Sequence, residues 1–190
     1  MKGKTREKLE FPRLIETTDR DKADRLDAAA SLDAANPTVR ALAAAVGGLG
    51  STPEETAARV LRFAQLRIAY AGDTGRTAAA TARYGPEPGI EELADTLTIV
   101  RRGHDDCDGK ARVCVALLRA RGIEARIRPV RQRGQFTHVQ AEARWKGSDS
   151  HKLAQEGGWI LLEPTAREAL LGESPADVIA RTGHLWIHEK

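Results

Sequence analysis

Cysteine is rare in this chain of 190 residues, which contains two. Cys107 and Cys114 fall on one expected helix, where seven residues separate them by about 10.5 Å along the axis. A disulfide needs Cα atoms within about 7 Å of each other, so an internal bridge is excluded if both lie on that helix. Two free thiols are typical of a reducing compartment.

The chain also lacks an apolar segment long enough to cross a bilayer. Its alanine-rich runs, DAAASLDAA and ALAAAVGGLG, are too short and too interrupted. The first residues, MKGKTREKLEFPRL, contain no apolar core of the kind that a secretory signal needs. We therefore expect a cytoplasmic protein with no membrane partner.

A strong excess of one charge is missing as well, because 30 Lys and Arg face 27 Asp and Glu, a formal net charge of +3. Charge alone therefore argues against nucleic acid as the partner. The arginine-rich segment RIRPVRQRGQ (126–135) keeps one alternative open, a binding module with an inactive site. Such arginines also occur on solvated strand edges.

The first half of the chain contains mainly helix signals. Residues 1–20 alternate charges around few apolar positions, as a mobile tail does. Helices are expected over 21–35, from Pro37 to the glycines at 47 and 48, and from Pro53, with Ser51 or Thr52 as the cap. Residues 72–100 are rich in glycine and proline and are expected to form loop with short helical pieces.

The second half predicts one long helix followed by strands. Asp105 is expected to cap the helix, with Asp108 three residues later as an acidic form of the capping box, and Gly122 to end it. Strands are expected over 124–132, 137–147 and 158–165, then a helix begun by Ser174 and a final strand, HLWIHE (184–189). The layout predicts an α+β fold: a helical part over 21–70 and a core at about 100–165, in a single domain over 21–190.

Cys107 is the candidate nucleophile because it falls at the start of the long helix. Backbone N–H groups there have no partner within the helix and could hold an oxyanion, and the helix dipole favours a thiolate. The flanking aspartates, Asp105, Asp106 and Asp108, raise a thiol's pKa instead. A nucleophilic cysteine here would need a cation nearby, such as an imidazolium.

His138 is the best-placed histidine, since it begins the most regularly alternating strand on its polar face. Glu163 ends an apolar strand, where a lone carboxylate is costly without a partner. Cys107, His138 and Glu163 in this order could form a nucleophile, a general base and an orienting acid. Each has an alternative: a structural thiol, a polar strand-end residue, and a partner for the arginines at 126, 128 or 131.

A metal site was the competing interpretation of the same region. Its ligands would be His104, Cys107, Cys114 and His138. Two sulfurs that lie two helical turns apart cannot share a zinc ion at bond lengths of about 2.3 Å. We therefore expect neither a metal nor a cofactor.

The sequence resembles the transglutaminase-like superfamily of papain-type cysteine enzymes. The similar blocks are GHDDCDGKARVCVALLRARGIEARIRPV, FTHVQAEARW and GWILLEPT, with a looser likeness at FAQLRIAYAGD. The resemblance implies a papain-like core whose nucleophile helix packs against an antiparallel sheet. It places Cys107 at the nucleophile position, His138 at the base position and Glu163 at the orienting-acid position.

The same resemblance implies an enzyme that attacks amide, peptide or glutaminyl carbonyls of a protein or peptide through a thioester on Cys107. Release by water would make it a hydrolase, and release by an amine a transamidase. We expect the hydrolase, because Asp105, Asp106 and Asp108 should keep the entrance polar and wet and the chain has few aromatic residues to wall an amine tunnel. Small members of the superfamily occur in bacteria and phages, so a virion-associated role is open. Two departures stand out: Glu163 replaces the usual aspartate, and Gln140 replaces a frequent tryptophan. Gln65, Tyr70 and His104 are candidates for the second oxyanion donor.

Overall fold

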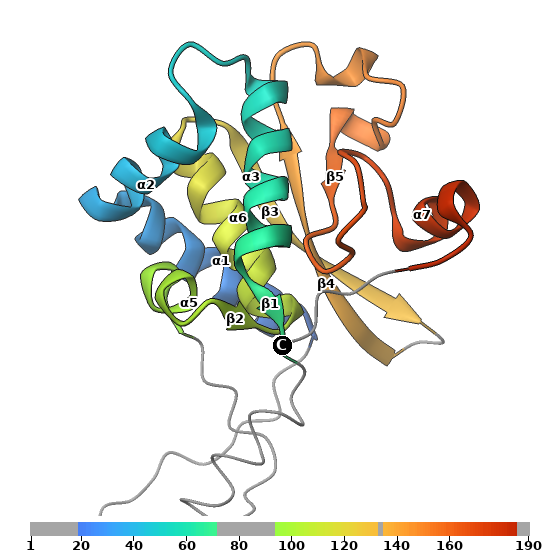
Figure 1. Cartoon of the computed structure of the whole chain (residues 1–190), viewed down its shortest axis with the longest axis horizontal. Coiled ribbons are helices and arrows are strands. Elements are labelled where there is room, and N and C mark those ends of the chain that lie inside the picture. Colours follow the sequence, from blue (N-terminus) through green and yellow to red (C-terminus); the bar gives the residue numbers. More distant parts are fainter. Residues whose placement is uncertain (1–18, 72–93, 133–134, 186–190) are drawn as a thin grey trace, which may run out of the picture.

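Helix α6 (Cys107–Ala120) is the central element of the protein. The computed structural model describes residues 19–71, 94–132 and 135–185, shown in colour in Figure 1. Figure 1 shows most of the helices on one side and the sheet on the other, and α6 contacts both groups. Residues 108–118 of α6 are all buried, so its N-terminal residue is carried on a rigid support.

The helices that surround α6 begin at well-formed caps. They are α1 (Asp19–Ala35), α2 (Pro37–Gly47), α3 (Pro53–Arg67) and α5 (Thr96–Arg102). Thr52 and Glu55 form a reciprocal capping box at α3, and Asn36 accepts a hydrogen bond from the Thr38 amide at α2. The expected helices over 21–35 and 37–47 and from Pro53 are therefore confirmed.

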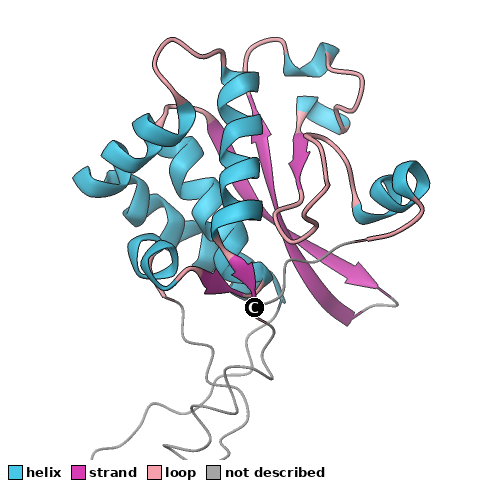
Figure 2. Cartoon of the chain, in the orientation of Figure 1, coloured by secondary structure: helices cyan, strands magenta, loops and turns pink. Residues whose placement is uncertain are grey.

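The sheet is antiparallel, in the order β3–β4–β5 (Figure 2). Its strands are β3 (Glu124–Gln132), β4 (Gln135–Arg144) and β5 (Ile160–Leu162). Val139, Ala141 and Ala143 of β4 are fully buried and belong to the core cluster that contains α6 residues, which confirms the predicted alternation. The fold class is α+β, as predicted.

Smaller elements complete the described chain. Strands β1 (Ala69–Tyr70) and β2 (His104–Asp105) pair in parallel, and two short 3₁₀ turns, η1 (Ser148–Ser150) and η2 (Glu156–Gly158), precede β5. Helix α7 (Pro175–Thr182) lies apart from the other helices (Figure 1) and begins at the predicted Ser174 cap.

Several expected boundaries were wrong. The second strand begins two residues earlier than expected and ends at Arg144. The third is shorter than expected, because η2 precedes it and it ends at Leu162. Residues 184 and 185 are not in a strand, and the rest of the expected final strand lies outside the described residues. Most of the expected tail (1–18) and loop (72–93) also lies outside them.

A buried ion pair joins three helices. Asp33 of α1 accepts two hydrogen bonds from Arg112 of α6, from Nε at 2.8 Å and from Nη2 at 3.1 Å. The same carboxylate accepts from the backbone and the hydroxyl of Thr96, at the start of α5, at 3.1 and 2.8 Å. All three residues are buried. One buried carboxylate therefore accepts from both α5 and α6, which fixes these helices against α1.

Replacing Arg112 by methionine should lower the free energy of unfolding by about 3–5 kcal/mol, because the buried Asp33 charge loses its cation. Chemical denaturation at neutral pH measures this change. Glu124→Gln, at the exposed pair with Arg144, should change it by less than about 1 kcal/mol. Equal effects of the two substitutions would contradict a supporting role for the buried pair.

Candidate active site

Cys107 is the first residue of α6, and its cap is Asp106 rather than the predicted Asp105. Oδ1 of Asp106 accepts a hydrogen bond from the Gly109 amide at 3.2 Å. Asp105 cannot cap, because its backbone pairs with β1 and its carboxylate binds Arg102 and the Asp106 amide. Gly109 occupies the third helical position, so the predicted acidic capping box is also wrong.

Gly109 explains why a glycine follows the aspartates. A Cβ at this position would lie 2.3 Å from Cγ of Asp105. The missing side chain lets the Asp105 carboxylate pack against the first turn of α6. The segment DDCDG therefore folds as a compact cap that presents Cys107 at the helix N-terminus.

The Cys107 thiol lies between an aspartate and strand β4. Its side chain is half-buried, and Sγ donates to Oδ1 of Asp108 at 3.6 Å. The backbone N–H of Val139 is close enough to the sulfur to lower its pKa, which places the sulfur near the residue that follows His138. Asp108 also forms an ion pair with Lys22 of α1 at 2.9 Å. The nucleophile candidate is therefore fixed against the predicted histidine strand.

Electrostatics favour the protonated thiol in the resting protein. Burial raises the pKa of Cys107 most, and the carboxylates of Asp108 and Asp106 raise it further, whereas the backbone N–H of Val139 lowers it. Burial and these carboxylates outweigh the stabilisation of the thiolate that was expected from the helix dipole. Attack by this sulfur therefore requires a base that removes its proton in the reaction.

The two thiols should differ strongly in alkylation. Cys107 is half-buried, whereas Cys114 is fully buried and burial raises its pKa to about 12. Iodoacetamide should label Cys107 in the folded protein, at a rate that rises with pH from about pH 7 to pH 9, and Cys114 only after unfolding. Asp108→Asn should accelerate the labelling of Cys107, because it removes a negative charge beside the sulfur. Peptide mass spectrometry reports both sites; equal rates for the two cysteines, or slower labelling in Asp108→Asn, would contradict this electrostatic account.

His138 and Glu163 contact each other directly. Nε2 of His138 lies 2.9 Å from Oε2 of Glu163, whose side chain is fully buried. Gln140 donates to the same oxygen at 2.7 Å. Thr165 donates to Oε1 through its backbone N–H, at 3.0 Å, and through its hydroxyl. Four donors therefore surround a carboxylate that would be costly to bury alone.

This arrangement also fixes the tautomer of the histidine. Burial raises the pKa of Glu163, but the hydrogen bonds from His138, Thr165 and Gln140 outweigh it and hold the pKa below its ordinary value. An ionised carboxylate only accepts, so Nε2 of a neutral His138 carries the proton. Nδ1 then keeps its lone pair and is the nitrogen available as a base.

The side chain of Gln65 supports the backbone at Glu163 instead of facing a substrate. Its Nε2 donates to the carbonyl of Glu163 at 3.3 Å and to those of Ala166 and Ala169 at 2.9 Å each. Gln65 is buried on α3, with its amide nitrogen occupied by this loop. Its candidacy as an oxyanion donor is therefore wrong. Tyr70 and His104, on β1 and β2, stay predictions for that role.

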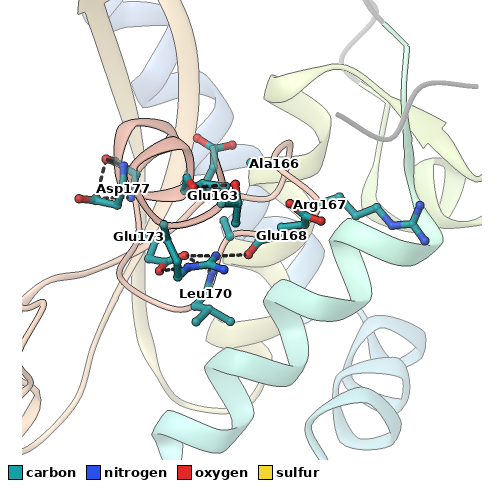
Figure 3. Close-up of polar contacts among 12 residues, drawn as sticks. Glu163, Ala166, Arg167, Glu168, Leu170, Glu173 and Asp177 are labelled. Carbon is teal, nitrogen blue, oxygen red and sulfur yellow. Dashed lines mark hydrogen bonds and ion pairs between the residues drawn. The ribbon is translucent and has the colours of Figure 1, made fainter. Parts of the chain in front are cut away.

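The loop that follows Glu163 is held a second time by α7 (Figure 3). Arg181 of α7 forms two hydrogen bonds of 2.7 Å with the carboxylate of Glu173 and a third with the carbonyl of Glu168. Glu173 also accepts from the Leu170 amide at 2.9 Å. The loop thus has contacts on both sides, which limits movement of Glu163.

Lys110 is a site neighbour that the sequence interpretation missed. It lies one turn after Cys107, is fully buried, and donates to the carbonyls of Ala64, at 2.9 Å, and Ile68 at the end of α3. Burial lowers its pKa to about 8, while nearby Cys114, Glu163 and Asp105 raise it. The sequence contains one signal for this burial: Lys110 lies four residues before Cys114, on the apolar stripe of the same helix.

The other histidines of the described residues have different neighbours, and His188 lies outside these residues. His104 is in β2, His151 lies 3.7 Å from Glu54 at the start of α3, and His184 lies 3.2 Å from Glu168. Within residues 19–71, 94–132 and 135–185, no cluster of three or more His, Cys, Asp or Glu is arranged to hold a metal ion. None of the helices in these ranges is both long and apolar enough to span a membrane.

Among the comparisons with known proteins, a family model supports this fold. None of the curated proteins matches the sequence at a significant level. A solved structure that matches is the 2.00 Å crystal structure of a "putative protease" from Parabacteroides distasonis, with a TM-score of 0.47 and 13% identity. The match covers 76% of this chain and 28% of the other chain, so this chain spans less than a third of the length of the solved protein.

The model of the transglutaminase-like superfamily matches residues 40–164, which include Cys107, His138 and Glu163. The chain belongs to the transglutaminase-like superfamily.

Proposed function

We propose that this protein is a cysteine-dependent hydrolase of amide, peptide or glutaminyl carbonyls, with Cys107 as nucleophile, His138 as general base and Glu163 as orienting acid. One observation carries the proposal. The His138–Glu163 hydrogen bond of 2.9 Å forms on the strand whose next residue, Val139, lies near enough to Cys107 for its backbone N–H to lower the pKa of the thiol. Three distant chain segments thus supply the residue types that thiol acyl transfer requires, which supports the proposal.

The reaction follows from these positions. Nδ1 of His138 removes the thiol proton as Sγ of Cys107 attacks the carbonyl carbon, and helix N-terminal N–H groups, including that of Cys107, stabilise the oxyanion. The C–N bond breaks, the imidazolium gives its proton to the leaving amine or ammonia, and a thioester remains on Cys107. His138 then removes a proton from water, which attacks the thioester and releases the acid and the free thiol.

The contacts of the arginine-rich strand support an enzyme over a nucleic-acid binding module. Arg126 and Arg128 both pair with the buried carboxylate of Glu142, at 2.7 and 3.0 Å. Arg126 also stacks on Trp159, 3.9 Å from the ring centroid. Two of the arginines that suggested an anionic partner are thus engaged by side chains of the protein itself.

We propose water as the acceptor of the acyl group, but the aspartates beside Cys107 do not support this choice as expected. The three aspartates beside Cys107 were expected to keep the entrance polar and wet, but all three are buried and engaged in caps and ion pairs. The remaining support is composition: an amine competes with water only in a site that orients it and excludes solvent, commonly between large aromatic walls, and aromatics make up 4% of this chain.

The test is mass spectrometry of a glutamine-containing peptide pool incubated with the protein and a labelled primary amine. Cleaved or deamidated peptides without incorporated amine are expected from the wild type and from Cys114→Ala, and none from Cys107→Ala. Efficient incorporation of the amine would assign a transamidase of the same fold. If Cys107→Ala converts the pool as the wild type does, or if neither converts it, the protein is not a cysteine hydrolase of these substrates.

A further inference from the structure

Gln140 donates to the same carboxylate oxygen as His138. Its Nε2 lies 2.7 Å from Oε2 of Glu163, and Nε2 of His138 lies 2.9 Å from that oxygen. The two donors come from the same face of β4, two residues apart. Gln140 is 4% exposed and Glu163 is fully buried, so solvent cannot replace this contact cheaply.

A glutamate at this position needs such a contact more than an aspartate would. Its side chain has one more rotatable bond, and the terminal torsion of a glutamate has a broad range. Thr165 holds Oε1 with two hydrogen bonds but leaves Oε2 to be oriented by other groups. With Gln140 in place, both oxygens carry two donors and the carboxylate plane is fixed towards His138.

The direction of the hydrogen bond is also determined. Glu163 is ionised, because its hydrogen bonds hold the pKa low despite burial. The Gln140 atom that faces it must therefore be the amide nitrogen. A second donor on Oε2 also makes this oxygen a weaker base, so that the shared proton stays on Nε2 of His138.

We propose that Gln140 is a positioning residue, which holds the Glu163 carboxylate in the orientation that keeps His138 with its proton on Nε2 and Nδ1 free towards Cys107. The inference rests on the proposed function of these three residues. It assigns a role to the side chain that replaces the frequent tryptophan of relatives, and it links that replacement to the glutamate in place of aspartate.

Two substitutions separate hydrogen bonding from packing. Gln140→Met keeps the length of the side chain and removes the donor, and we expect kcat to fall about tenfold with KM little changed. Gln140→Glu keeps the shape but places a second acceptor against the carboxylate, so the loss should be larger, about 100-fold. Arg144→Met is the matched control: it lies on the same strand and face, contacts Glu124 instead, and should change kcat less than twofold.

The second readout needs no substrate. Nitrogen NMR of histidine-labelled protein should show His138 of the wild type and of Arg144→Met as one tautomer, protonated on Nε2, and a mixture in Gln140→Met. If wild-type turnover does not depend on Cys107, the proposed function fails while this spectrum still tests Gln140. A wild-type tautomer in folded Gln140→Met, or loss of the folded state in both Gln140 variants, would overturn the inference.

Discussion

Replacing Glu163 by glutamine should lower turnover by roughly 10³- to 10⁴-fold, as the corresponding change does in Ser–His–Asp enzymes. The carboxylate accepts from four donors, two on each oxygen. An amide replaces one accepting oxygen with an NH₂ group, so either orientation sets donor against donor. If the NH₂ faces His138, the imidazole must turn or move its proton to Nδ1, and the base for Cys107 is lost.

The measurement is kcat on a peptide identified in the glutamine-peptide experiment, with circular dichroism to confirm the fold. Glu163→Asp should retain more activity than Glu163→Gln, because it keeps the charge although the carboxylate withdraws by one methylene. Glu124→Gln, a charge loss at an exposed pair, should leave kcat unchanged. Wild-type turnover in Glu163→Gln would assign Glu163 to structure and leave a dyad of Cys107 and His138.

Elements set by local signals could be predicted from the sequence. Thr52, Pro53 and Glu55 make contacts within a few residues of each other, so the start of α3 follows from the sequence alone. The cap of α6 could not be chosen in the same way, since Asp105 and Asp106 are equally suitable residue types. Arg102 and the pairing of β2 with β1 decide it, and both lie outside the helix.

The candidate site could likewise be predicted only in part from the sequence. His138 and Glu163 were found because alternation places one on a polar face and burial makes the other costly alone. The supports of Glu163 were not found, because Gln65 is 98 residues away along the chain and the Gln140 contact crosses from β4 to the end of β5. Such partners depend on tertiary packing, which residue spacing does not report.

His138→Ala should have the largest effect on turnover, a loss of roughly 10⁴- to 10⁶-fold, as for histidines of other nucleophilic triads. Burial and the carboxylates of Asp108 and Asp106 keep the Cys107 thiol protonated, so the sulfur depends on an external base more than an activated thiolate would. Without the imidazole, only hydroxide or buffer can remove the proton. The kcat/KM of this variant should therefore rise with hydroxide concentration, and the pH dependence of kcat/KM measures this.

Added imidazole should restore part of the activity of His138→Ala, because a small base can occupy the space left beside Cys107 and Glu163. The same addition should do nothing for Glu163→Gln, in which the base is present but misoriented. His151→Ala is the control: His151 lies near Glu54 at the N-terminal end of α3, whereas Gln65, which supports Glu163, lies near its C-terminal end. A loss of turnover that added imidazole restores in His104→Ala rather than in His138→Ala would transfer the base to β2, and Glu163 would then orient a residue outside the proton path.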